Sequence, residues 1–170
     1  MKILGVDPGL DNSGYALIES GKDCNISNLK DSVSILSFNT IISDSEKLLE
    51  ERLKYIHSKF KKLLSELGPD VVVVEDIYSN SSYPQSGLKL ASVKGVVELA
   101  VSQKDIKLAN LAATKVKKTI VGRGNAKKEQ VAKMIEEGFN LKGAGSLHES
   151  DALAVALAYL IINTRKVKVI

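Results

Sequence analysis

The chain has 170 residues, 44% of them hydrophobic, and a net charge of +4, values typical of one globular domain and favourable for a polyanionic partner such as nucleic acid. Its longest apolar run, 152–162, is too short to span a bilayer, and its one cysteine, Cys24, excludes an intramolecular disulfide. We therefore expect a single domain over residues 1–170, located in the cytoplasm, with no signal peptide at its N-terminus.

The first half of the chain predicts three strands and then a long helix. The strands are expected at 2–7, near 14–20 and at 33–42. After them, Ser43 and Glu46 have the Ser-x-x-Glu spacing of a capping box, which marks the start of a helix. Apolar residues recur at helical spacing behind this box as far as Gly68, where the helix should end.

The second half of the chain alternates strands with helices. A run of β-branched residues at 70–76 is typical of a strand covered on both faces, and 106–111 is predicted to be another buried strand. Helices are expected at 84–103, 114–121, 126–138 and 147–163. Three opening strands followed by this alternation predict an α/β fold, a mixed five-stranded sheet flanked by helices.

Polar side chains lie where several of these elements end or begin. Asp7 closes the first strand and Glu75 closes the Val-rich strand, whereas His148 and Asp151 lie three residues apart in the first turn of the last helix. Strand ends and adjoining helix termini share one edge of such a sheet, where functional sites usually lie. Because clustered carboxylates repel one another, the pattern favours a divalent cation such as Mg²⁺, and two such ions can promote phosphodiester hydrolysis.

Each of the four residues also has an ordinary structural explanation. An aspartate before Pro-Gly, such as Asp7, often forms a turn, and a glutamate at a strand end can simply meet solvent. His148 could be a surface histidine, and an acid at a helix start such as Asp151 complements the helix dipole. The four positions taken together make that explanation weaker. Glu149 is different, because a second capping box with Ser146 accounts for it, so we leave it out of the site.

Five blocks of sequence, in order along the chain, resemble those of a known family. They are GVDPGLDNSGYAL, VVVVEDIYSNSS, GLKLASVKGVV, ATKVKKTIVGRGNAKKEQV and HESDALAVALAY. Over nearly its whole length the chain resembles the RuvC-type Holliday-junction resolvases, crossover junction endodeoxyribonucleases with the RNase H-like fold. The resemblance implies a homodimer that makes paired nicks in junction strands of like polarity, leaving 5′-phosphate and 3′-hydroxyl ends. It also implies the branch-migration proteins RuvA and RuvB as partners.

The same resemblance assigns metal binding and catalysis to four side chains, Asp7, Glu75, His148 and Asp151. The family has either Asp or His at the position of His148. We expect two Mg²⁺ ions in each active site, and Mn²⁺ should be able to substitute because imidazole suits Mn²⁺ better than Mg²⁺. Asp11 is a further carboxylate near the site, and its role stays open.

Contacts to DNA are predicted for one tyrosine and for a basic segment. Tyr78 corresponds to a family aromatic that stacks on bases at the opened junction, although a packed core tyrosine is the alternative. The basic residues predicted to contact DNA are Lys117, Lys118, Arg123 and Lys128. The resemblance places Lys117 and Lys128 near the scissile phosphate, and Asn125 as a helix N-cap would put Lys128 in a first turn, which favours anions.

Gly87, Ala91 and Gly95 form a stripe of small residues along the expected helix 84–103. Such a stripe permits close approach either to another helix of the fold or to a second subunit, and the resemblance favours the homodimer.

Three other functions stay open. They are another RNase H-like nuclease acting on RNA or other branched DNA, a sugar-kinase-like or actin-like ATPase, and a non-catalytic junction-binding module.

Overall fold

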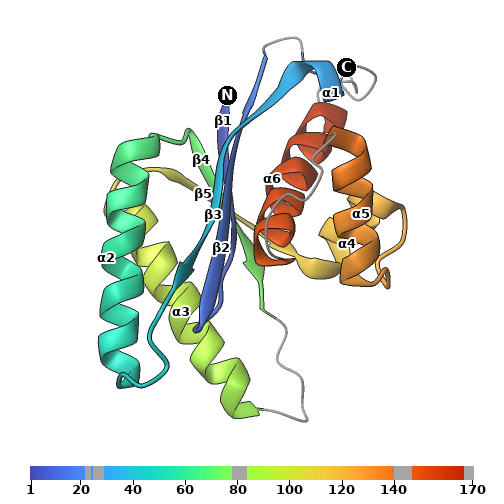
Figure 1. Ribbon diagram of the computed structural model, residues 1–170. Helices are drawn as coiled ribbons and strands as arrows, with labels where there is room; N and C mark the ends of the chain where they lie inside the picture. Colours follow the sequence, from blue (N-terminus) through green and yellow to red (C-terminus); the bar gives the residue numbers. More distant parts are fainter. Residues whose placement is uncertain (22–23, 25–28, 78–83, 140–146, 167–170) are drawn as a thin grey trace.

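A five-stranded sheet forms the centre of the molecule (Figure 1). The computed structural model describes residues 1–21, 24, 29–77, 84–139 and 147–166. The strands are β1 Lys2–Asp7, β2 Asn12–Ser20, β3 Val33–Ile42, β4 Val71–Asp76 and β5 Lys107–Ala112. They lie in the order β3-β2-β1-β4-β5, antiparallel among the first three and parallel from β1 through β4 to β5. The predicted mixed sheet is confirmed.

Helices cover both faces of this sheet. They are α1 Leu29–Ser32, α2 Leu49–Leu67, α3 Pro84–Ser102, α4 Ala113–Val121, α5 Lys128–Phe139 and α6 Leu147–Lys166. Helices α2 and α3 lie together on one face, and α6 lies on the other with α4 and α5 outside it (Figure 1). Alternate strand residues therefore enter two cores. Ile3 and Val73 pack on the α6 face, whereas Leu4 and Val74 pack against α2 and α3.

Two glycines allow α6 to lie directly against the sheet. A Cβ atom on Gly5 of β1 would be 2.1 Å from the carbonyl oxygen of Ala152, and one on Gly14 of β2 would be 2.1 Å from that of His148. No side chain fits at such distances, so the backbone of α6 contacts the strands where only glycine is possible. This close packing fixes the height of the start of α6 over the sheet.

The predicted start of the first long helix is wrong. α2 begins at Leu49, six residues beyond Ser43. The Asp44 carboxylate accepts a hydrogen bond from the Glu46 amide at 3.0 Å, and Ser43 bonds to the turn between β1 and β2 instead of capping a helix. Polar residues of this kind favour turns as readily as caps, which explains the error.

Two smaller expectations also need correction. The segment predicted as a second buried strand is β5, but it is the edge strand, and the exposed fraction of Leu108 is 37%. Asn125 is not the N-cap of α5, which begins at Lys128. Instead, the Gln130 side chain accepts a hydrogen bond from the Lys127 amide at 3.0 Å.

Among the described residues, no helix has the length and hydropathy needed to cross a membrane.

Candidate active site

The sheet register brings Asp7 and Glu75 to the same end of the sheet and to the same face of it. Gly5 of β1 pairs with Val73 of parallel β4, so the residues two further along each strand, Asp7 and Glu75, are neighbours. Since Gly5 and Val73 face α6, these two carboxylates face α6 as well. Both strands end at this edge, which is the lower end of the sheet in Figure 1.

The first two turns of α6 supply the other two predicted side chains. The Nδ1 atom of His148 lies 3.0 Å from Oδ2 of Asp7, a residue 141 positions away in the sequence. His148 reaches Asp7 because its own backbone lies against Gly14, the strand partner of Asp7. Asp151 is one helical turn further on, and its side chain is 14% exposed. The four predicted site residues therefore come together.

Burial and mutual repulsion raise the pKa values of two carboxylates of this cluster. The pKa of Glu75 is raised to about 8, first by burial and then by the negative charges of Asp7 and Asp151 and a hydrogen bond with Asp7. Burial likewise raises the pKa of Asp151. The site thus holds more carboxylates than it can ionise together at neutral pH without added positive charge.

Lys128, at the start of α5, supplies part of that positive charge. Its Nζ atom lies 2.5 Å from Oδ2 of Asp151. Burial acts to lower the pKa of Lys128, but the bond to Asp151 and the charges of Asp151, Asp7 and Glu75 outweigh burial, so this pKa is raised. The predicted phosphate-contacting lysine is therefore a direct neighbour of the carboxylates.

The raised pKa of Glu75 predicts an unusual pH dependence of folding in the absence of metal. Folded Glu75 holds its proton up to about pH 8, whereas the unfolded side chain releases it near pH 4.5, the ordinary pKa of a glutamate. The folded state then binds more protons in this window, so the free energy of unfolding should fall as pH rises through it. Urea unfolding in EDTA at about pH 5 and about pH 9 measures this loss.

The matched variants for this measurement are Glu75→Gln and Glu66→Gln. Glu75→Gln removes the titrating group and should flatten the dependence on pH. Glu66 is an exposed residue of α2 paired with Lys62, so Glu66→Gln should leave the dependence unchanged. Equal slopes for Glu75→Gln and the parent chain would contradict the assignment.

The other predicted DNA contacts lie near α6 or outside the described residues. Lys117 and Lys118 belong to α4 and Arg123 to the turn after it, and both α4 and α5 pack against α6. Within the described ranges, none of these three side chains forms an ion pair or hydrogen bond with the four clustered residues. Tyr78 lies outside the described residues.

Two other acidic residues interact elsewhere. Asp11 forms an ion pair with Arg52 of α2, and Glu149 accepts a hydrogen bond from the Thr40 hydroxyl at 3.3 Å. The omission of Glu149 from the site agrees with this contact, although Ser146 of its proposed capping box lies outside the described residues. The importance of Gly14, against which the start of α6 packs, was not predicted from the sequence. The signal that was available is a glycine inside a predicted strand, which often marks a close approach of another backbone.

The donor set of the cluster fits a divalent cation. Three carboxylates and one imidazole offer the oxygen and nitrogen ligands that Mg²⁺ and Mn²⁺ accept, and the raised pKa of Glu75 marks negative charge that lacks compensation. Among the described residues, no three His, Cys, Asp or Glu side chains are already arranged around one metal position. Asp151 pairs with Lys128 and His148 with Asp7, so a cation bound by Asp151 would compete with Lys128 for this carboxylate.

Nearly the whole chain is similar to known proteins. The family model of crossover junction endodeoxyribonuclease RuvC matches residues 3–159. The crossover junction endodeoxyribonuclease RuvC of Ehrlichia chaffeensis is 35% identical over 159 residues, which cover 94% of this chain and 96% of that protein. The protein of the same name from Wolbachia pipientis is 34% identical and is covered to 93%.

Solved structures agree with the fold. Thermus thermophilus RuvC superposes with a TM-score of 0.81 at 24% identity, covering 98% of this chain and 97% of that one. The same protein in complex with a Holliday junction substrate also gives 0.81, at 22% identity with 97% and 96% coverage. The sheet is thus the RNase H-like sheet of these nucleases, which as a family depend on metal ions. By its sequence over nearly the full length, the chain belongs to the RuvC family of crossover junction endodeoxyribonucleases.

Proposed function

We propose that Asp7, Glu75, His148 and Asp151 form the active site at which this chain hydrolyses phosphodiesters of a Holliday junction. The observation that carries the proposal is the convergence of these four side chains, from two strand ends and one helix start, at a single edge of the sheet. Members of the family it belongs to are crossover junction endodeoxyribonucleases, so junction DNA is the expected substrate. We propose paired nicks in two strands of like polarity, with 5′-phosphate and 3′-hydroxyl ends.

We also propose that the three carboxylates hold two Mg²⁺ ions, with His148 as a further ligand and with Mn²⁺ able to substitute. Bound divalent ions would supply positive charge at the scissile phosphate and lower the pKa of the attacking water. The protein's own part is to keep three mutually repelling carboxylates at one place. The rigid β1–β4 pairing and the seating of α6 on Gly14 do this.

Basic residues beside the cluster would hold the DNA backbone. Lys128 already lies within hydrogen-bond distance of Asp151, and its position in the first turn of α5 suits a phosphate. We propose that Lys117, Lys118 and Arg123, carried by α4 and the turn after it, contact phosphates further from the cleaved bond. Tyr78 is proposed to stack on bases at the opened centre of the junction.

Two copies of the chain are proposed to act together, because a four-way junction has approximate twofold symmetry and two cuts need two sites. Helix α3 supports this proposal. The exposed fractions of Leu88 and Leu99 are 70% and 50%, and Ala91 and Gly95 are exposed between them. A second copy would cover this apolar stripe.

We further propose that residues 1–170 act as a single nuclease domain in the cytoplasm and work with the branch-migration proteins RuvA and RuvB.

A cleavage assay on synthetic substrates tests the function. With Mg²⁺ or Mn²⁺, we expect symmetric nicks in a mobile four-way junction and little cutting of linear duplex or of an RNA–DNA hybrid. Sedimentation of the protein on the uncut junction in EDTA should give two chains per junction. Preferential cutting of the hybrid would support the other RNase H-like nucleases instead, and one chain per junction would contradict the dimer.

A further inference from the structure

The turn that follows Asp7 is held by a residue from a distant helix. Residues 8–11 connect β1 to β2, and Gly9 makes this turn very tight, because a Cβ atom there would be 2.1 Å from the carbonyl oxygen of Asn12. On the inside, the Ser13 hydroxyl donates to the Gly9 carbonyl at 2.6 Å and accepts from the Gly9 amide at 3.2 Å. The first half of the turn is thereby fixed from within.

Arg52 of α2 fixes the second half from outside. Its Nε atom donates a hydrogen bond to the Ser43 hydroxyl at 2.9 Å, and its guanidinium forms an ion pair with Asp11. Ser43 in turn donates from its hydroxyl to the Leu10 carbonyl at 2.6 Å and from its amide to the Asp11 carbonyl at 3.0 Å. The Ser43 hydroxyl thus links Arg52 of α2 to the turn, and the Ser43 amide adds a second contact between Ser43 and the turn.

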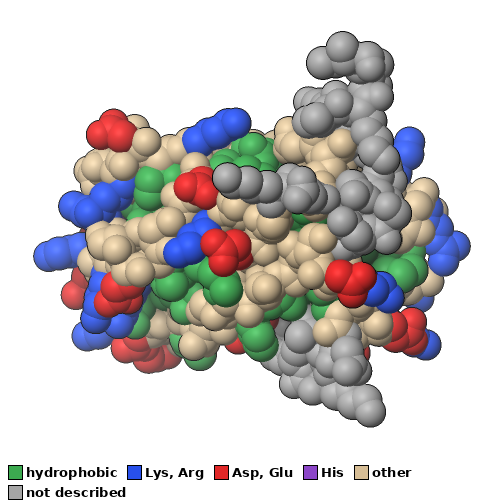
Figure 2. All heavy atoms as spheres, turned by 90° about the horizontal axis from the view of Figure 1, so that it is seen from above, with side chains coloured by type: hydrophobic (Ala, Val, Ile, Leu, Met, Phe, Trp, Pro, Cys, Tyr) green, Lys and Arg blue, Asp and Glu red, His purple; other side chains and the backbone are tan. Residues whose placement is uncertain are grey.

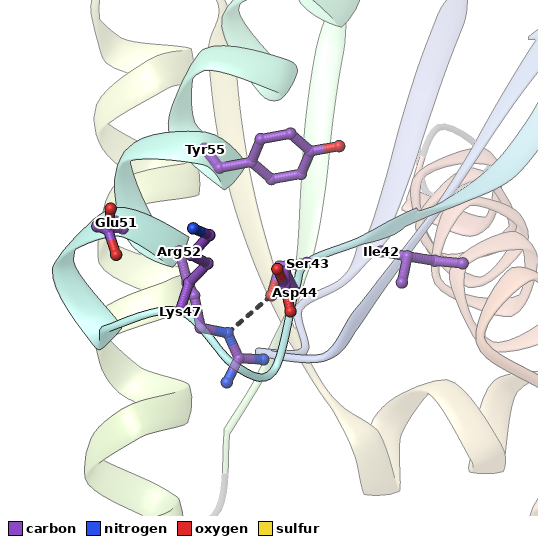
Figure 3. Close-up of a pocket in the computed structure, with 7 residues that line it drawn as sticks. All are labelled: Ile42, Ser43, Asp44, Lys47, Glu51, Arg52 and Tyr55. Atoms are coloured by element: carbon purple, nitrogen blue, oxygen red, sulfur yellow. Dashed lines mark hydrogen bonds between the residues drawn. The ribbon is translucent and has the colours of Figure 1, made fainter.

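These contacts lie beside a pocket of about 360 Å³ between the end of β3 and the start of α2 (Figure 3). Figure 3 shows Arg52 extended from α2 toward Ser43, with the hydrogen bond between them drawn as a dashed line. Arg52 itself is only 8% exposed, an unusual state for an arginine that its two partners explain. None of the four clustered active-site residues lines this pocket.

We propose that Arg52 is a positioning residue for the metal site, acting through Ser43 and Asp11 on the turn that follows Asp7. This inference rests on the proposed role of Asp7. The Asp7 side chain is the last on β1, so the rigidity of the following turn decides whether its carboxylate stays on the α6 face beside Glu75 and His148. A fixed carboxylate binds a cation without a further ordering cost, and partners that orient ligands in this way strongly affect metal affinity.

Arg52 is buried whereas its partner Asp11 is exposed, and this difference decides which of the two residues should be substituted. The Asp11 side chain is 72% exposed, whereas that of Arg52 is 9% exposed. Removing the guanidinium therefore leaves Asp11 in water, but removing Asp11 leaves a buried charge with less compensation. Arg52→Met is the cleaner test because it keeps most of the volume of the side chain and creates no buried charge.

The experiment measures Mn²⁺ binding by calorimetry and junction cleavage in single turnover for Arg52→Met, Arg52→Lys and Ser43→Ala. For Arg52→Met, we expect the dissociation constant for Mn²⁺ to rise and the cleavage rate to fall, each by roughly 10- to 100-fold. Arg52→Lys keeps the charge opposite Asp11 but loses the forked geometry, so it should recover part of both. Junction affinity in EDTA should stay within about twofold of the parent chain, since no phosphate contact changes.

The matched control is Lys62→Met, which breaks an exposed ion pair with Glu66 on the same helix and should change neither readout. Parent-like Mn²⁺ affinity and cleavage in folded Arg52→Met would overturn the proposal. Should Arg52→Met not fold, parent-like Mn²⁺ affinity in Ser43→Ala would overturn it equally.

The reference variant is Asp7→Asn, which separates this inference from the function on which it rests. If Asp7→Asn loses Mn²⁺ binding and cleavage while Arg52→Met and Ser43→Ala lose neither, only the role of Arg52 is wrong. If Asp7→Asn itself binds Mn²⁺ and cuts like the parent chain, the active-site assignment is wrong, and the role of Arg52 is overturned with it.

Discussion

Asp7→Asn is expected to lower the rate of junction cleavage by more than about 100-fold without weakening junction binding. Replacing residues that merely orient metal ligands lowers affinity or activity by roughly 10- to 100-fold, so loss of a direct ligand should exceed that range. The amide is nearly the same size as the carboxylate but carries no charge, and DNA is then repelled less. Single-turnover cleavage and gel-shift affinity in EDTA are the two measurements.

A second readout distinguishes this loss from simple unfolding. Asp7 is one of the charges that raise the pKa of Glu75, so Asp7→Asn should lower that pKa and make the metal-free protein more stable above pH 7 or so. The control is Asp70→Asn. The Asp70 carboxylate accepts a hydrogen bond from the Lys2 amide at 2.7 Å, at the start of β1 rather than its end, and its loss should not affect cleavage. Undiminished cutting by Asp7→Asn would refute the active site.

Gly14→Ala should disrupt the site without changing any of its side chains. The added methyl group would lie 2.1 Å from the carbonyl oxygen of His148 and 3.0 Å from its Cβ atom. Because β2 is paired on both sides within the sheet and cannot yield, the start of α6 must move outward, and the His148–Asp7 contact of 3.0 Å should be lost. We expect about 1–3 kcal/mol of destabilisation and roughly 100-fold slower cleavage.

The matched substitution is Gly138→Ala near the end of α5, where nothing lies within 4 Å of the added atom. That variant should be neutral or more stable by up to about 1 kcal/mol, because alanine favours a helix more than glycine does. Thermal unfolding and single-turnover cleavage of the two variants are compared directly. A Gly14→Ala protein as stable and as active as Gly138→Ala would show that α6 does not depend on this contact.

Acidic and basic side chains are mixed at the end of the sheet opposite the carboxylate cluster. Figure 2 views the molecule from the end where β1 begins and shows Lys, Arg, Asp and Glu side chains interspersed over that face. The carboxylate cluster and Lys128 belong to the end where β1 and β4 finish. A polyanion is therefore expected to bind at the end that carries the cluster and the basic residues of α4 and α5.

The local pattern of apolar and polar residues in the sequence determined most of the helices and strands. The run Val71–Val74 encodes a strand buried on both faces, because every one of its residues is apolar and β-branched, and these four residues are 2% exposed or less. The positions of Asp7 and Glu75 at strand ends follow from the same pattern. The start of α2 and the edge position of β5 could not be predicted, since turn and cap residues overlap and strand order depends on the connections.

The contacts among distant side chains were decided only by the tertiary structure. The amino-acid sequence alone predicted the four residues of the proposed site, but His148 reaches Asp7 only because Gly5 and Gly14 let α6 lie on the strands. The pairing of Asp11 with Arg52, 41 residues away, had no signal in the sequence. Periodicity records which side of an element is buried, whereas the approach of two charged groups depends on how the helices pack. That packing is a property of the whole core.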